Sequence, residues 1–184
     1  MPAKKKAPYG PSDRDVQIPR FAGRGKAYVY VLPRDGEDQI KLGFSRDPFE
    51  RFRTLHPRFY AYFNLQQGLL IEVDTIREAR RIERLLIERW PEHRASAPFD
   101  VSSHAGGHTE WFRGIGDEAA AFAQRVAERY GYTVYAPLQA WLRIRMCDYL
   151  ENLYDWAQRL LEAIEWQACN MPEVTRDPGY ASAL

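Results

Sequence analysis

The chain has 184 residues, a length that suits one compact domain with additions but is short for two full-sized domains. Hydrophobic residues make up 45% of it and charged residues 28%, which excludes a wholly disordered chain. The formal net charge is only +1, so no overall field draws the protein to nucleic acid or to an anionic membrane. Any site for a polyanion therefore has to be local.

Cysteine usage and hydropathy favour a cytoplasmic protein. The two cysteines, Cys147 and Cys169, have no second cysteine or histidine nearby at metal-ligand spacing, which favours a reducing compartment. No run of about 18 apolar residues occurs, and the lysines near the start precede no apolar segment. We therefore expect a protein that is neither secreted nor membrane-spanning and that has no membrane partner.

The first 26 residues are rich in basic side chains and proline. They hold seven Lys or Arg residues against two Asp, and four prolines interrupt them. This composition predicts a flexible basic arm over residues 1–26. Two readings remain open for it: contact with a phosphate backbone, or a solvated tail without a partner.

Two β-type runs, residues 27–32 and 39–44, flank a turn that contains Asp35 and Gly36, a pattern typical of a β-hairpin. Alternation along the two strands places four chemically distinctive residues on one face: Tyr28, Tyr30, Lys41 and Gly43. That face combines phenols, an ammonium group and a glycine. The missing side chain of the glycine would let a ligand approach the backbone there.

A short helix is predicted after the hairpin. Asp47 is a strong N-cap residue, Pro48 suits the first helical position, and Glu50 stands where a capping box requires an acid. The helix carries Arg51 and ends before Pro57.

The next elements are a third strand within residues 65–73 and a second helix that a Thr75–Glu78 capping box opens and that runs to about Trp90. A turn of about 100° per residue groups the apolar side chains of this helix into one stripe: Ile76, Ala79, Ile82, Leu86, Ile87 and Trp90. Glu83 falls inside the stripe, where an unpaired carboxylate is costly. It therefore needs a partner, either an arginine or tyrosine side chain or a metal ion.

Two helices complete the chain. Asp117 is a candidate N-cap for a helix that runs to Tyr130 and is closed by Gly131. Residues 137–169 predict one long helix whose wide apolar face either packs within the chain or forms a dimer interface. The expected fold class is α/β, with a small, mainly antiparallel three-stranded sheet flanked by helices and a C-terminal helical extension.

An ordered set of short motifs resembles the GIY-YIG nuclease superfamily, and most closely its phage and bacterial subgroup with lysine at the start of the second motif. The set comprises Tyr28-Val-Tyr30, Lys41-Leu-Gly43, Arg51, Glu83 and Glu110-Trp-Phe112. The resemblance covers about residues 27–113. It implies four segments: an arm at 1–26, a nuclease domain at 27–113, a helical extension at 114–170 and a tail at 171–184.

The resemblance also implies roles for individual residues. Tyr30 would be a general base or water-orienting group, Arg51 would bind the scissile phosphate, and Glu83 would hold one Mg²⁺ or Mn²⁺ ion. Phosphodiester cleavage needs such parts, because it must activate water and neutralise charge on the phosphoryl oxygens. The remaining assignments are assistance by Lys41, supporting roles for Tyr28 and His56, backbone approach at Gly43, and a second acid at Glu110.

We therefore expect a metal-dependent endonuclease that hydrolyses DNA phosphodiester bonds. Two alternatives remain open. One is a non-catalytic DNA-binding module of the same fold. The other is a protein-interaction scaffold that forms a homodimer or binds a partner protein through the helix from Trp141 to Trp166.

Overall fold

The computed structural model describes residues 25–101 and 108–171. They divide into two units: the residues up to Arg145 belong to the larger one, and those from Met146 onward belong to the smaller one. The predicted basic arm lies outside the described residues except for Gly25 and Lys26, and the predicted tail lies outside them except for Met171.

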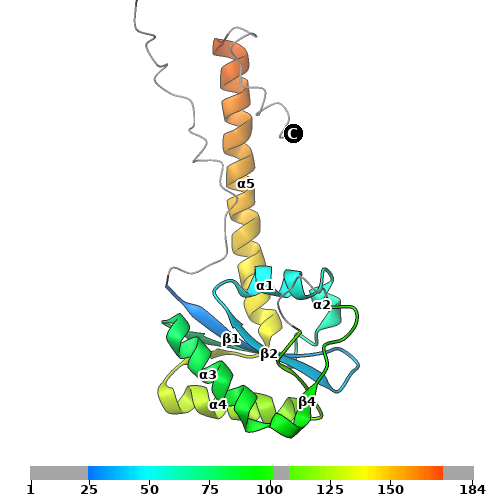
Figure 1. The fold of residues 1–184 in the computed structure, drawn as a ribbon. Coiled ribbons are helices and arrows are strands. Elements are labelled where there is room, and N and C mark those ends of the chain that lie inside the picture. The colour runs from blue at the N-terminus through cyan, green and yellow to red at the C-terminus, as the bar shows by residue number, and fades with distance from the viewer. Residues whose placement is uncertain (1–24, 102–107, 172–184) are drawn as a thin grey trace, which may run out of the picture. The chain divides into compact units, whose positions relative to one another are not determined.

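A six-stranded sheet forms the centre of the larger unit within the described residues (Figure 1). Its order is β4-β5-β2-β1-β3-β6, and every neighbouring pair is antiparallel. The strands are β1 (Ala27–Pro33), β2 (Gln39–Ser45), β3 (Leu69–Val73), β4 (Arg94–Ala95), β5 (Trp111–Arg113) and β6 (Thr133–Tyr135). The α/β class is confirmed, but the expected sheet of three strands was too small.

The three predicted strands are the central ones. β1 pairs with β2 as a hairpin, with Tyr30 opposite Gly43 and Leu32 opposite Lys41. The strands that the prediction missed contain only two or three residues each. Such segments are too short to show a period-two alternation, so their strand conformation depends on pairing with neighbours that are distant in sequence.

Sequence signals for helix termini are largely confirmed. In α1 (Pro48–Leu55) the Asp47 side chain accepts a hydrogen bond from the backbone N–H of Glu50 at 3.1 Å. In α3 (Ile76–Arg89) both halves of the Thr75–Glu78 capping box are present. The remaining helices are α2 (Phe59–Tyr62), the 3₁₀ turn η1 (Pro91–His93), α4 (Gly116–Tyr130) and α5 (Leu138–Asn170).

For α4 the predicted N-cap residue was wrong, and the predicted closing residue, Gly131, is confirmed. Ile115 is the N-cap residue, and no side chain caps the helix there, so Asp117 lies in the first turn instead. An acidic side chain in the first turn still interacts favourably with the helix dipole. At the other end Gly131 adopts φ +72, the left-handed conformation that glycine adopts without strain.

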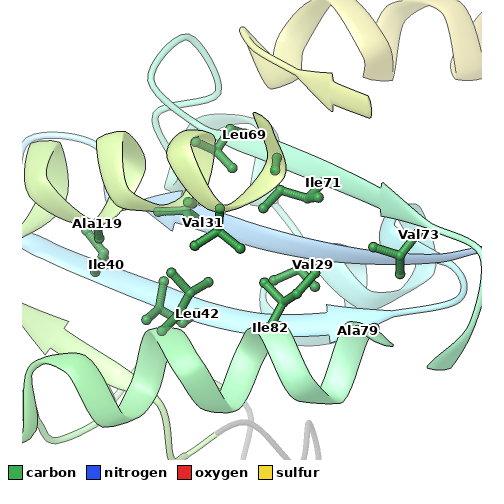
Figure 2. Close-up of a cluster of buried hydrophobic side chains, with 14 of the residues drawn as sticks. Val29, Val31, Ile40, Leu42, Leu69, Ile71, Val73, Ala79, Ile82 and Ala119 are labelled. Atoms are coloured by element: carbon green, nitrogen blue, oxygen red, sulfur yellow. The ribbon is translucent and has the colours of Figure 1, made fainter. Parts of the chain in front are cut away.

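The sheet separates two hydrophobic clusters. On one face α3 and α4 cover an aliphatic cluster that includes Val29, Val31 and Leu42 (Figure 2). On the other face lies an aromatic cluster of Tyr28, Tyr30, Leu32, Phe52, Leu55, Phe59, Phe63, Leu70, Val101, Trp111, Leu138, Trp141 and Leu142. In β1 the side chains of Val29 and Val31 belong to the aliphatic cluster and those of Tyr28 and Tyr30 to the aromatic cluster, as the alternation in the hairpin predicted.

The first residues of α5 pack within the larger unit, because Leu138, Trp141 and Leu142 belong to the aromatic cluster. Farther along α5, several large apolar side chains are exposed: Ile144, Met146, Leu150, Tyr154, Leu161 and Trp166. A homodimer or partner complex through this helix stays a prediction. No helix in the described part of the chain combines the length and the apolar character that crossing a membrane requires.

Candidate functional site

Tyr30 and Gly43 form a close cross-strand pair at the centre of the candidate site. The two residues are opposite each other in β1 and β2, and Tyr30 is only 1% exposed. A Cβ atom added to Gly43 would lie 2.4 Å from the Tyr30 hydroxyl oxygen, well inside van der Waals contact. On this face the glycine therefore accommodates the phenol of Tyr30 rather than an approaching ligand.

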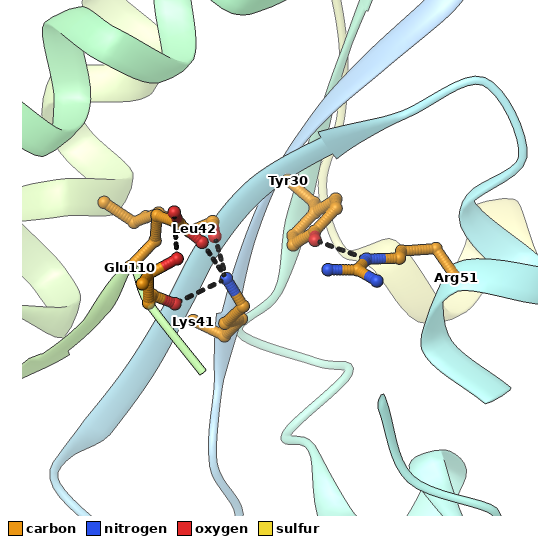
Figure 3. A network of polar contacts seen from close by, with 6 residues as sticks. Tyr30, Lys41, Leu42, Arg51 and Glu110 are labelled. Atoms are coloured by element: carbon orange, nitrogen blue, oxygen red, sulfur yellow. Dashed lines mark hydrogen bonds and ion pairs between the residues drawn. The ribbon is translucent and has the colours of Figure 1, made fainter. Parts of the chain in front are cut away.

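Arg51 contacts the hydroxyl group of Tyr30. Its Nε donates a hydrogen bond to Tyr30 Oη at 3.3 Å (Figure 3). The Phe52 ring packs edge-on against the Tyr30 ring. Burial raises the pKa of Tyr30, and the nearby Arg51 charge only partly opposes this shift. The phenol is therefore neutral at pH 7. Its hydroxyl hydrogen is not donated to any group among the described residues.

Lys41 is fully buried and uses all its donors. Its ammonium group donates to the carbonyl oxygens of Leu42 at 2.7 Å and Thr109 at 3.0 Å, and to Glu110 Oε2 at 2.9 Å (Figure 3). Burial lowers the pKa of Lys41, while the Glu110 carboxylate acts against this change. With three acceptors engaged, Lys41 holds Glu110 in place and has no lone pair with which to accept a proton.

Glu110 lies directly before β5 in a strained conformation. Its φ of 60° is in the left-handed region, and its carbonyl oxygen accepts a hydrogen bond from the Leu42 N–H at 3.0 Å. Burial alone would raise the pKa of Glu110, but the Thr109 hydroxyl and the Lys41 ammonium outweigh it and lower the pKa. Strained backbone conformations concentrate at functional sites, so the conformation of Glu110 makes this residue a candidate for a functional role.

Glu83 extends from α3 toward the same group of charges. Burial, and then the negative charge of Glu110, raises the pKa of Glu83, while Lys41, Arg51 and Arg80 oppose the shift. Within the described residues its carboxylate accepts no hydrogen bond. A half-buried carboxylate with a raised pKa beside a second carboxylate is an arrangement typical of a binding or catalytic site.

Two residues with predicted supporting roles pack elsewhere. Tyr28 is buried with its ring 5.4 Å from the Trp141 ring. His56 follows α1, stacks on Tyr62 at 4.1 Å between ring centroids, and accepts a hydrogen bond from the Arg58 N–H through Nδ1. Supporting roles for Tyr28 and His56 in the chemistry stay predictions.

The sequence reasoning missed the pairing of Lys41 with Glu110. The two residues are 69 positions apart, and they meet because β5 pairs with β2. A signal for a partner was present, since a lysine on an inward-facing strand position needs a counter-charge. The identity of that partner was not readable from the sequence, because β5 shows no periodicity.

A family model for the T5orf172 domain matches residues 27–129, more than half of the chain. The chain belongs to the T5orf172 family. This domain family differs from the GIY-YIG superfamily, for which no match was found, so the resemblance inferred from the short motifs was wrong. T5orf172 domains are nuclease-like, DNA-binding domains, which gives this chain a DNA-related function at that level.

The T5orf172 match includes all five residues of the cluster: Tyr30, Lys41, Arg51, Glu83 and Glu110. It also includes α4 on the aliphatic face of the sheet. No curated protein and no solved structure was found to match the chain.

The donor set of the cluster fits a hard divalent cation. Among the described residues no group of three or more His, Cys, Asp or Glu side chains could enclose a metal. Glu83 and Glu110 provide two carboxylates, and the Glu83 carboxylate has no hydrogen-bond donor in the described structure. Mg²⁺ commonly binds one or two carboxylates and retains several waters, so these residues fit it.

Proposed function

We propose that this T5orf172 domain is a metal-dependent endonuclease that hydrolyses DNA phosphodiester bonds. The observation that carries the proposal is the meeting of a guanidinium, a neutral phenol and two carboxylates beside the middle of β2. Phosphodiester hydrolysis needs a cation near the phosphoryl oxygens, a group that orients water, and ligands for a metal. These four side chains supply each of them.

Arg51 is the proposed phosphate-binding residue. Its planar guanidinium can donate several hydrogen bonds at once, a geometry that suits phosphate. Nε contacts Tyr30, so the two groups would meet the same substrate phosphate together. Binding of the phosphate by Arg51 would offset negative charge that builds on the phosphoryl oxygens during the reaction.

Tyr30 is the proposed water-orienting residue. Because burial raises its pKa, the phenolate is scarce at neutral pH, and a role as general base is disfavoured. The neutral hydroxyl instead accepts from Arg51 and can donate its own hydrogen to a water or a substrate oxygen. Of the two roles that the sequence left open for Tyr30, general base and water orientation, we therefore favour water orientation.

Glu83 and Glu110 are the proposed metal ligands, with Mg²⁺ or Mn²⁺ as the ion. A bound divalent cation would supply Lewis acidity and a water of lowered pKa at the scissile phosphate. Lys41 would then be a positioning residue, because it holds Glu110 and its three donors are engaged by acceptors of the chain itself. A cation at the carboxylates would also offset the repulsion that raises the pKa of Glu83.

The test is cleavage of supercoiled, linear and branched DNA by the purified chain with Mg²⁺, Mn²⁺ or EDTA. Arg51→Gln is measured beside Arg53→Gln, an exposed arginine of the same helix that pairs with Glu50. We expect cleavage with either metal and none with EDTA. Arg51→Gln should lower the rate by about 100-fold, in the range found for loss of one donor to a developing charge, with Arg53→Gln near wild type.

Three outcomes would contradict the proposal or one of its parts. Cleavage that persists in EDTA would show that no metal is needed. Equal cleavage rates for the two arginine variants would show that Arg51 does not bind the scissile phosphate. DNA binding without turnover under every metal condition would instead identify the chain as a non-catalytic DNA-binding module.

A further inference from the structure

The outer surface of α3 carries a stripe of four arginines: Arg77, Arg80, Arg81 and Arg84. Their spacing of i, i+3, i+4 and i+7 places them next to one another on one side of a helix. All four are exposed, and they line a shallow groove together with Ile76, Leu85 and Glu88. The chain as a whole has a net charge of +1, so this surface is a strong local concentration of positive charge.

The arginines of the stripe are not paired with acids. None of the four arginines forms an ion pair within the described residues. Glu78 is engaged in its capping box with Thr75, and the two other acids near the stripe, Glu83 beside Arg80 and Glu88, are fewer than the four arginines. Four adjacent like charges repel each other on a helix, so their clustering costs stability unless an anion binds there.

The middle of the stripe lies beside the candidate site. Arg80 is one of the charges that oppose the raised pKa of Glu83, which places its guanidinium near that carboxylate. Arg80 also lies over the ring of Phe44, 5.8 Å from the ring centroid, next to Gly43 in β2. From Arg80 the stripe extends along α3 in both directions, to Arg77 on one side and to Arg84 on the other.

The dimensions of the stripe match a nucleic-acid backbone. Arg77 and Arg84 are seven residues apart, about 10.5 Å along the helix axis at 1.5 Å per residue. Phosphates of one strand of B-DNA advance by about 3.4 Å each along the duplex axis, so the stripe spans about three of them. Arginine also favours phosphate through its planar, bidentate donor geometry.

We infer that the arginine stripe on α3 binds the phosphate backbone of duplex DNA beside the scissile bond. The inference rests on the proposed function for its choice of DNA and deepens it by assigning the path of the substrate away from the site. Contacts of this kind position a duplex without reading its sequence. Affinity should therefore be salt-dependent and nearly independent of base sequence.

The test is fluorescence anisotropy of a labelled DNA duplex with the full chain in EDTA, over a series of salt concentrations. Arg77→Gln/Arg84→Gln removes two charges of the stripe and keeps Arg80, which neighbours Glu83. The matched control is Arg125→Gln/Arg129→Gln, two exposed arginines of α4. The stripe variant should bind more weakly, and its plot of log affinity against log salt should be shallower by about 1.8, or about 0.9 per lost contact.

The outcomes separate this inference from the proposed function. Equal DNA affinity of the two double variants, in a chain that still cleaves DNA, would show that the arginine stripe does not contact DNA. The proposed nuclease activity would be unaffected by that result. A shallower salt dependence for the stripe variant, in a chain that never cleaves DNA, would support the DNA contact of the stripe and contradict the proposed endonuclease activity. Displacement of DNA by polyglutamate as effectively as by unlabelled duplex would contradict a preference for phosphate and overturn the inference.

Discussion

Two half-buried glutamates of the same domain, Glu72 and Glu83, have opposite electrostatic surroundings. Glu72 in β3 pairs with the Lys26 ammonium and accepts a hydrogen bond from the Tyr135 hydroxyl at 3.0 Å. These donors outweigh its burial and lower its pKa. Glu83 in α3 accepts no hydrogen bond from the described residues, and burial together with Glu110 raises its pKa.

The comparison contrasts a carboxylate that has its donors within the fold with one that lacks them in the described structure. Both sites combine a glutamate, a lysine and a tyrosine, so residue types alone do not distinguish them. At Glu72 every polar group has its partner, which favours the folded state. At Glu83 the nearby positive charges do not fully offset burial and the charge of Glu110, a cost that is explained if a cation or substrate binds there.

The largest expected effect is on cleavage. Glu83→Gln should lower metal-dependent cleavage by about 100-fold or more, because even the loss of a group that only hydrogen-bonds to a metal ligand commonly costs about 10- to 100-fold. Glu72→Gln should leave the rate unchanged, since its carboxylate serves the fold. Cleavage of supercoiled DNA at saturating Mg²⁺ measures both. Equal losses in the two variants would contradict the separation of roles.

The second effect concerns the two lysines that pair with acids. Lys41→Met should destabilise the domain by about 2–4 kcal/mol, because it leaves two carbonyl oxygens and a partly buried Glu110 carboxylate without their donor. Lys26→Met should cost clearly less, since the Lys26 side chain is 46% exposed and exposed ion pairs contribute little to stability. Urea denaturation gives both values. A cost for Lys41→Met no larger than that for Lys26→Met would refute the buried role.

Much of this arrangement was readable from the sequence. Alternation placed Tyr30, Lys41 and Gly43 on one face, and the apolar stripe of α3 marked Glu83 as an acid that needs a partner. Period-two and helical patterns encode which way a side chain points, so these inferences depend on neighbours in sequence. They located the centre of the sheet and most residues of the candidate site, whose roles stay predictions.

The remaining features depend on contacts between distant segments. The strands β4, β5 and β6 are defined by pairing alone, and the Lys41–Glu110 contact follows from β5. The family assignment failed for another reason. Tyr-x-Tyr and Lys-x-Gly are short and composed of common strand residues, so even an ordered set of them does not separate one domain family from another.

A third effect tests the close packing at the site. Gly43→Ala should destabilise the domain by about 1–3 kcal/mol, as overpacking of a core does, and should displace the Tyr30 hydroxyl from Arg51. Gly116→Ala is the control, because a Cβ there would meet Ile40 at an ordinary 3.5 Å. Thermal denaturation and DNA cleavage would be measured together. Unchanged cleavage in a folded Gly43→Ala protein would separate the Tyr30–Arg51 contact from the chemistry.

The smallest effect is a difference in pH dependence between Glu72→Gln and Glu83→Gln. The folded-state pKa of Glu72 is lowered, so its carboxylate contributes stability above its unfolded pKa, near 4.5, and loses it as pH falls through the folded value. Glu72→Gln should therefore cost about 1–2 kcal/mol at pH 7 and progressively less in acid.

Glu83 should show the reverse sign. Its folded-state pKa is raised, so the ionised carboxylate opposes folding once the pH exceeds the unfolded value, and protonation in acid removes that penalty. Glu83→Gln should then be at least as stable as wild type at pH 7 without metal, with the gain vanishing as pH falls below 4.5. Urea denaturation in EDTA from acid to neutral pH measures both variants. A loss of stability at pH 7 in both would mean that Glu83 has a structural donor, and the contrast with Glu72 would be gone.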